Sequence, residues 1–139
     1  MTVTTFETIE RMDAVDPSIR GWLRFEGAAA FIAGLALFGW LDGPWLLVIP
    51  LLLLPDVSML GYLGGPRLGA LTYNAAHTWV PGLALLAVGL IADARMLAIA
   101  GTILVAHVGM DRAAGYGLKL PTAFQDTHMG RIGKSRAQS

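Results

Sequence analysis

Hydrophobic residues gather in four long runs along the chain. The runs cover residues 22–41, 45–63, 71–92 and 96–116. Each is about 20 residues long, and a helix of that length, rising about 1.5 Å per residue, crosses a hydrocarbon core about 30 Å thick. No run shows the alternation of a strand, and lipid accepts only helices or closed barrels. The pattern therefore predicts four transmembrane helices.

Short turns separate the runs, at residues 41–44, 64–67 and 93–95. Links of this length favour antiparallel neighbours, so we expect an all-α, up-down four-helix bundle. We expect one domain over residues 1–133 with polar N- and C-terminal segments, followed by a disordered tail at 134–139. Small residues inside the runs would let the helices pack closely, among them Gly27, Gly34, Gly82 and Gly89.

The composition agrees with a membrane protein and excludes several other classes. Hydrophobic residues make up 55% of the chain and charged residues 14%, which leaves too little polar surface for a soluble domain and too much apolar surface for disorder. Ten basic and ten acidic residues give no net charge, so no nucleic-acid partner is expected. The absence of cysteine excludes disulfides and thiolate sites.

The basic residues predict the orientation in the membrane. An even number of spans places both termini and the middle turn on one side, where nine basic residues fall, against Arg95 alone on the other side. This asymmetry predicts an inner-membrane protein with cytoplasmic termini. The nine are Arg11, Arg20, Arg24, Arg67, Arg112, Lys119, Arg131, Lys134 and Arg136.

Five acidic or histidine residues interrupt the apolar runs, each at a cost of roughly 2.5–3.5 kcal/mol on insertion scales. All lie in the cytoplasmic half of the predicted spans: Glu26, Asp56, His77, His107 and Asp111. His107 and Asp111 are four residues apart and share a helix face. Pro55 removes a backbone hydrogen bond directly before Asp56, which predicts a kink and a pocket beside this carboxylate.

Carboxylates and imidazoles from three helices match a site for Zn, Mn or Mg. We expect Asp56, His77, His107 and Asp111 to be the ligands of a divalent metal, assisted by Glu26 or Asn74. The plainer alternative is that the histidine and aspartate side chains form hydrogen-bonded pairs that tie the helices together.

A second polar cluster follows the fourth run. Asp126 or His128 could act as acid or base there, and Arg112 or Lys119 could steady an anionic headgroup. Arg67, Arg112, Lys119 and Arg131 could together hold a phosphate. The alternative is a juxtamembrane basic segment that meets anionic lipid.

Three stretches carry a family resemblance: residues 55–62 (PDVSMLGY), 73–78 (YNAAHT) and 107–133, which contains HVGMDR, GYGLK and DTHMGRIG. Together they resemble, over residues 20–133, a family of small bacterial four-helix membrane proteins known only as a domain of unknown function. A more distant likeness is to bacterial membrane-bound metal-dependent hydrolases. Their order of motifs is matched by Pro55-Asp56, His77, His107, Asp111 and Tyr116-Gly117. Those enzymes carry further histidine ligands, so the likeness implies compensating roles for Asp126 and His128.

The leading expectation is a metal-dependent hydrolase at the cytoplasmic leaflet that acts on a lipid, a phosphoester or another amphiphile. The alternatives are a proton or metal-ion transporter or channel subunit, haem binding through His77 and His107, and a structural membrane subunit. The expected partners are the lipid bilayer and an amphiphilic substrate, and a homodimer is left open.

Overall fold

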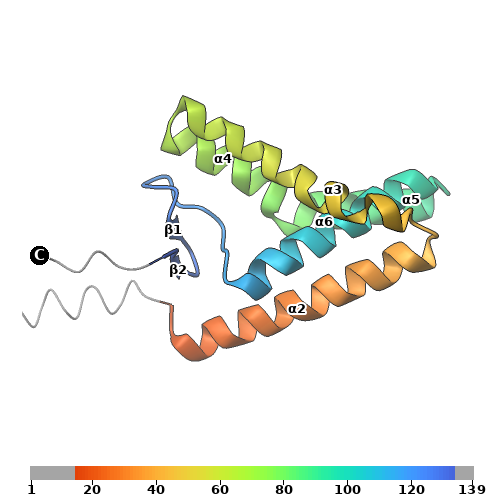
Figure 1. Ribbon diagram of the computed structural model, residues 1–139, viewed down its shortest axis with the longest axis horizontal. Coiled ribbons are helices and arrows are strands. Elements are labelled where there is room, and N and C mark those ends of the chain that lie inside the picture. The colour runs from red at the N-terminus through yellow and green to blue at the C-terminus, as the bar shows by residue number, and fades with distance from the viewer. Residues whose placement is uncertain (1–14, 134–139) are drawn as a thin grey trace, which may run out of the picture.

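The computed structural model describes residues 15–133. The predicted tail at 134–139, which contains Lys134 and Arg136, lies outside this range, as does Arg11 near the N-terminus. The fold is the predicted all-α bundle, with four helical stretches long and apolar enough to cross a membrane (Figure 1). The first stretch is α2, Pro17–Trp40, and the fourth is α6, Arg95–Ala114. The second contains η1 Trp45–Leu47, α3 Val48–Leu53 and η2 Leu54–Gly64, and the third contains α4 Pro66–His77 and α5 Trp79–Ile91.

Two helices begin earlier than the apolar pattern predicts, α2 at Pro17 and α4 at Pro66. Both start with proline, whose fixed φ suits the first helical position and whose missing N–H costs nothing there. Asp16 also caps α2 by accepting a hydrogen bond from the Ser18 N–H at 2.8 Å. Hydropathy therefore located the apolar part of each helix, whereas proline and the cap determine where the helix begins.

The second stretch changes helix type at the position where a kink was expected. It is α-helical from Val48 to Leu53 and continues as a 3-10 helix from Leu54 to Gly64. Pro55 cannot donate to the carbonyl one α-helical turn earlier, so the α-helical bonding ladder is interrupted there. A 3-10 run of 11 residues is long for this helix type and often marks a functional segment.

The third stretch, Pro66–Ile91, covers the span expected over 71–92 and is interrupted at one residue. Thr78 takes an extended conformation, φ −88° and ψ 160°, between α4 and α5. The physical reason is Pro81, which has no N–H to donate to the carbonyl of His77 four residues earlier. The break leaves the His77 carbonyl free for another donor.

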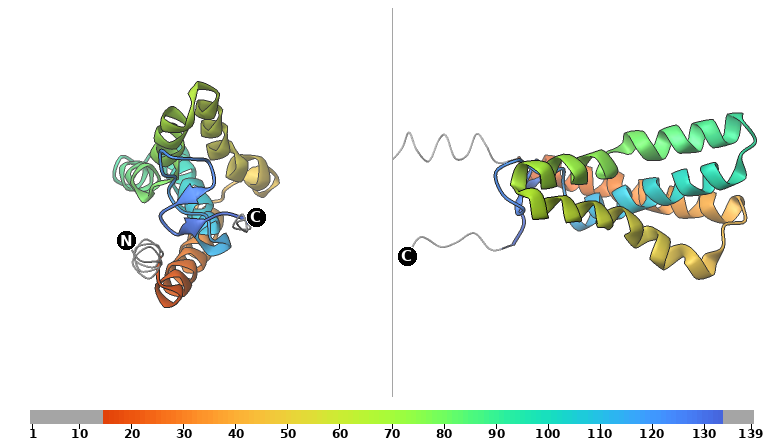
Figure 2. Two further views of the ribbon diagram at one scale, coloured as in Figure 1. Left: turned by 90° about the vertical axis from the view of Figure 1, so that its left-hand side faces the viewer. Right: turned by 90° about the horizontal axis from the view of Figure 1, so that it is seen from above.

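Helix α6 is the centre of the bundle, in contact with α2, α5 and α3 (Figures 1 and 2). In its most apolar window 61% of the residues are buried, against 17% or less in the other three stretches. Glycines permit this packing as predicted: a Cβ at Gly27 would lie 2.5 Å from the Arg112 Cβ, and one at Gly34 would lie 2.9 Å from the Ala106 Cβ. The outer helices expose large apolar side chains, as a lipid-facing surface requires.

The polar segment after α6 folds over one end of the bundle (Figure 2). Gly115, at φ 94°, ends α6, and the segment continues into two short antiparallel strands, β1 Asp126–Thr127 and β2 Gly130–Arg131. The turn between η2 and α4 lies at this same end. At the opposite end, the Arg95 guanidinium donates to the carbonyls of Leu41 and Asp42 and ties the two turns together.

Candidate metal centre

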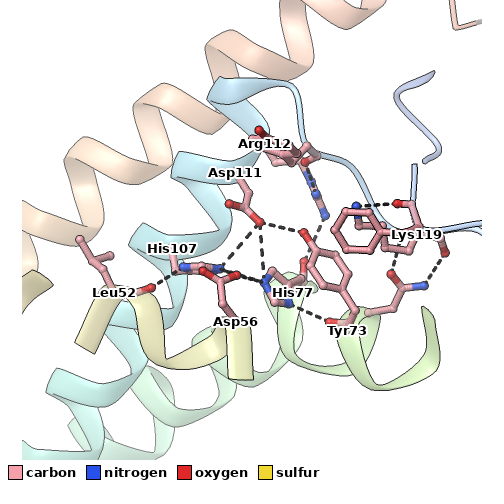
Figure 3. A network of polar contacts seen from close by, with 11 residues as sticks. Leu52, Asp56, Tyr73, His77, His107, Asp111, Arg112 and Lys119 are labelled. Atoms are coloured by element: carbon pink, nitrogen blue, oxygen red, sulfur yellow. Dashed lines mark hydrogen bonds and ion pairs between the residues drawn. The ribbon is translucent and has the colours of Figure 1, made fainter. Parts of the chain in front are cut away.

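The four predicted metal ligands meet at one point near the polar end of the bundle (Figure 3). Asp56 lies on η2, His77 is the last residue of α4, and His107 and Asp111 lie on α6. The Nε2 atoms of the two imidazoles are 2.9 Å apart. Asp56 Oδ1 lies 3.3 Å from the Nε2 of His77 and 3.6 Å from that of His107, and Asp111 Oδ2 lies 3.7 Å from both.

These separations fit a single metal ion. Zinc binds imidazole nitrogen and carboxylate oxygen at about 2.0–2.2 Å, so two ligand atoms of a tetrahedral site lie about 3.3–3.6 Å apart. The observed range of 2.9–3.7 Å brackets that spacing. Asp56, His77 and His107 also offer ligand atoms that all lie within 4.8 Å of one another. These three residues are compact enough for one ion, and Asp111, which is not part of that group, lies 3.7 Å from both imidazole Nε2 atoms.

The proton positions on both histidines follow from their backbone partners. The Nδ1 of His77 lies 2.8 Å from the Tyr73 carbonyl, and the Nδ1 of His107 lies 2.5 Å from the Leu52 carbonyl. A carbonyl only accepts, so each Nδ1 carries the proton, and each neutral ring presents a lone pair at Nε2. Two lone pairs and two carboxylates thus converge at this point. In metalloproteins the same Nδ1-to-carbonyl bonds orient the histidine ligands.

Proline creates one of these acceptors and frees another carbonyl at the site. In the 3-10 register the carbonyl of Leu52 would accept from residue 55, and Pro55 has no N–H. That carbonyl accepts from His107 instead. The carbonyl of His77, left free by Pro81, accepts from the Arg112 guanidinium at 3.1 Å. Both helix breaks therefore serve to position a histidine.

Tyr73 holds the site from the side of α4. Its ring stacks on His77 with centroids 3.6 Å apart and planes inclined by 11°. Its hydroxyl donates to Asp111 Oδ2 at 2.9 Å, which orients this carboxylate toward the histidines. Sequence analysis assigned no role to Tyr73. The i, i+4 spacing to a candidate ligand was the available signal.

A pocket of about 350 Å³ opens beside the cluster. Asp56, Asp111 and Tyr73 form its inner wall, and Tyr116, Lys119 and Phe124 contribute from the polar segment and the end of the bundle. The side chains of His77 and His107 are fully buried, whereas 32% of the Asp56 side chain remains exposed. The cluster is therefore closed on the histidine side and accessible on the carboxylate side.

Lys119 lies in this pocket wall and is 4% exposed. Its ammonium donates to the Phe124 carbonyl at 2.8 Å and lies 5.2 Å from the centre of the Tyr73 ring. Burial lowers the pKa of the Lys119 ammonium, and the negative charge of Asp111 acts in the opposite direction. Lys119 therefore places a cation in the wall of this pocket.

Other predicted site residues lie elsewhere. Glu26 is exposed on α2 and does not reach the cluster. Asn74 exchanges hydrogen bonds with the backbone of Lys119 at 2.8 and 2.7 Å, so it anchors the polar segment instead of contacting a metal. Arg112 is buried and donates to the carbonyls of Tyr116 and His77, so its guanidinium is committed to backbone acceptors.

The expected acid–base residues do not face the pocket. Asp126 accepts from the Thr122 hydroxyl at 2.7 Å and lies 3.6 Å from Arg131. His128 accepts a hydrogen bond from the Leu118 N–H at its Nδ1. Burial, followed by the positive charge of Arg112, lowers the pKa of the His128 imidazole. The proposed phosphate set is also divided, because Arg67 is exposed on α4 while Lys119 lies in the pocket.

The chain belongs to the family described as Domain of unknown function (DUF4260), whose model matches residues 20–132. This match agrees with the family resemblance noted in the sequence over almost the same range. No curated protein and no solved structure matched the chain. The comparisons give no support to the more distant hydrolase likeness.

Proposed function

We propose that this chain binds one divalent cation, Zn, Mn or Mg, through Asp56, His77, His107 and Asp111. The observation that carries the proposal is the convergence of two imidazole Nε2 atoms and two carboxylates, with Nε2–Nε2 and Nε2–carboxylate separations of 2.9–3.7 Å. The Tyr73 hydroxyl donates a hydrogen bond to Asp111 Oδ2. A divalent cation at the centre would bind all four groups and neutralise the charges of the two carboxylates.

We further propose that the cation serves a hydrolase. Structural metal sites are closed by protein ligands, whereas catalytic sites keep an open position. The exposed side of Asp56 and the pocket of about 350 Å³ leave room for a water as a fifth ligand beside the four side chains. A bound cation would supply a Lewis acid and an activated water. Lys119 would hold an anionic part of the substrate, and Tyr73 would keep Asp111 oriented. Asp126 and His128 have no part in this proposal.

An amphiphilic substrate, such as a lipid or a hydrophobic phosphoester, fits the surroundings best. An apolar groove of about 480 Å³ runs along η2, between Leu53 and Leu63, and shares Asp56 and Met59 with the metal pocket. A hydrocarbon chain in the groove would place its polar end beside Asp56. With the termini in the cytoplasm of a bacterial cell, the pocket would face the inner leaflet of the inner membrane.

Metal analysis of the purified full-length protein tests the first part. We expect about one equivalent of metal per chain in the wild type, and a loss of at least tenfold in His107→Ala and Asp56→Asn. Glu26→Gln is the matched control, because it removes a carboxylate from a span without touching the cluster. A wild-type protein that neither contains nor takes up Zn, Mn or Mg would refute the metal centre.

Turnover assays test the second part separately. The wild type, loaded with Zn or Mn, is incubated with phospholipids, lysolipids and aryl phosphoesters in detergent micelles. Hydrolysis that is lost in Asp56→Asn and weakened in Lys119→Gln supports the hydrolase. Stoichiometric metal without turnover above the Asp56→Asn background refutes it, and metal flux into liposomes that stops in Asp111→Asn would then establish transport.

A further inference from the structure

A second polar pocket lies at the same end of the bundle, outside the metal centre. Its volume is about 230 Å³. Arg20 and Arg24 reach it from the first turns of α2, and Arg131 reaches it from β2, more than 100 residues later in the chain. Fold topology thus brings together three guanidinium groups that sequence analysis did not group.

The cations in this pocket are incompletely paired. Arg24 uses its Nε to donate to the Ala113 carbonyl at 2.8 Å, and the Arg20 Nε is buried without a hydrogen-bond partner in the described chain. Among residues 15–133, no carboxylate lies within 4.0 Å of a guanidinium nitrogen of Arg20 or Arg24. Arg131 has one such neighbour, Asp126, at 3.6 Å.

The carboxylate that caps the start of α2 is already engaged. Asp16, one turn before Arg20, accepts hydrogen bonds from the N–H and the hydroxyl of Ser18. Hydrogen bonds from Ser18 also lower the pKa of the Asp16 carboxyl. Asp16 therefore caps the helix and does not neutralise the pocket.

Glycine backbone shapes the wall opposite the arginines. Gly130 has φ 111°, and a Cβ built there would lie 2.6 Å from the Arg20 Nη2, so this guanidinium packs directly on the glycine. Gly115 and Gly133 line the same pocket. The site is therefore a pocket lined by guanidinium groups and by glycine backbone.

We propose that Arg20, Arg24 and Arg131 bind a phosphate group, carried either by a lipid headgroup or by a soluble phosphate. Planar guanidinium groups pair with phosphate oxygens through two parallel hydrogen bonds, and several arginines at one pocket repel one another unless an anion joins them. The proposal does not depend on the metal. Tyr116 and Ile132 line both pockets, so the phosphate would lie next to the metal pocket.

The test is binding to the purified full-length protein in neutral detergent, with two probes. Inorganic phosphate is titrated by calorimetry, and phosphatidic acid is titrated by native mass spectrometry against phosphatidylcholine as background. Arg20→Gln and Arg24→Gln are expected to weaken phosphate binding by about tenfold or more, since each removes hydrogen bonds between charged groups. Arg67→Gln is the matched control, because it removes an exposed arginine at the same end of the bundle.

The outcomes separate the sources of phosphate. Saturable binding of inorganic phosphate that displaces phosphatidic acid supports a site for any phosphate group, and binding of phosphatidic acid alone supports a lipid headgroup site. If Arg67→Gln loses as much phosphate binding as Arg20→Gln and Arg24→Gln, the attraction is diffuse and the proposal is overturned. It is also overturned if neither probe binds. Metal content is measured in every variant, and we expect it to stay at the wild-type value, so this test and that of the metal centre can fail independently.

Discussion

The hydroxyl of Tyr73 offers a sharp test of the metal centre, because its removal alters one contact and leaves the rest in place. Tyr73→Phe deletes the donor that lies 2.9 Å from Asp111 Oδ2. The aromatic ring stays stacked on His77, and the bond from the His77 Nδ1 goes to the backbone carbonyl of residue 73, which the substitution preserves. Any change in metal affinity therefore reports on the orientation of Asp111.

Two independent estimates give the size of the effect. A hydrogen bond to a charged acceptor contributes about 1.5–3 kcal/mol. Loss of a group that orients a metal ligand typically lowers metal affinity by about 10- to 100-fold, which corresponds to about 1.4–2.8 kcal/mol. The estimates agree, so we expect Tyr73→Phe to raise the dissociation constant for zinc by about 10- to 100-fold.

The assay is a competition titration of zinc between the protein in detergent and a fluorescent chelator. Tyr62→Phe is the control, since the Tyr62 hydroxyl is buried without a hydrogen-bond partner in the described chain, and its ring packs on Phe124. The control makes the same chemical change and should keep the wild-type affinity. A Tyr73→Phe protein that folds and binds zinc within about twofold of the wild type would refute the role assigned to this hydroxyl.

Three further predictions follow from the packing and the polar segment. Pro81→Ala restores an N–H that competes with Arg112 for the His77 carbonyl, so we expect several-fold weaker zinc binding in the same titration. An unchanged zinc affinity would contradict the role of the helix break. Gly27→Val forces overlap with α6 and should lower the free energy of unfolding by about 1–3 kcal/mol in thermal melts, whereas Gly21→Val, with open space around it, should be near neutral. The pKa of His128 is lowered in the folded state, so below about pH 6.5 the unfolded chain binds more protons than the folded chain. The free energy of unfolding therefore decreases as the pH is lowered. His128→Gln should therefore lose less stability than the wild type between about pH 7 and pH 5, and identical pH profiles would contradict this.

The four clustered side chains could be predicted from the sequence because the cost of an ionisable residue in a membrane is a local property. An ionisable side chain in an apolar run needs a partner whatever the tertiary structure, and the shared depth of Asp56, His77, His107 and Asp111 suggested that they partner one another. Glu26 has similar depth but faces outward. Its neighbour Gly27 is the residue that packs against α6, and adjacent helix positions point about 100° apart. Depth alone therefore could not identify the members of the site.

The roles of Asp126 and His128 could not be predicted for a different reason. Their side chains are oriented by the two short strands and by contacts with residues 118, 122 and 131, in a segment without helical periodicity. The arginine pocket has the same origin, because α2 and β2 meet only after the polar segment folds back over the bundle. No spacing rule relates positions so far apart in the chain.

The sequence by itself determined the four apolar stretches, their up-down order and the identity of the four clustered side chains. These depend on hydrophobic periodicity, turn length and desolvation cost, which act over a few neighbouring residues. Only the packed helices determine which carbonyls orient the two histidines, which acceptors the Arg112 guanidinium binds and which carboxylate faces a pocket. Those features depend on hydrogen bonds between residues 35 and 55 positions apart in the chain, as between Arg112 and His77 and between His107 and Leu52. Such bonds exist only when the helices have packed, because packing alone brings the acceptors freed by proline to their donors.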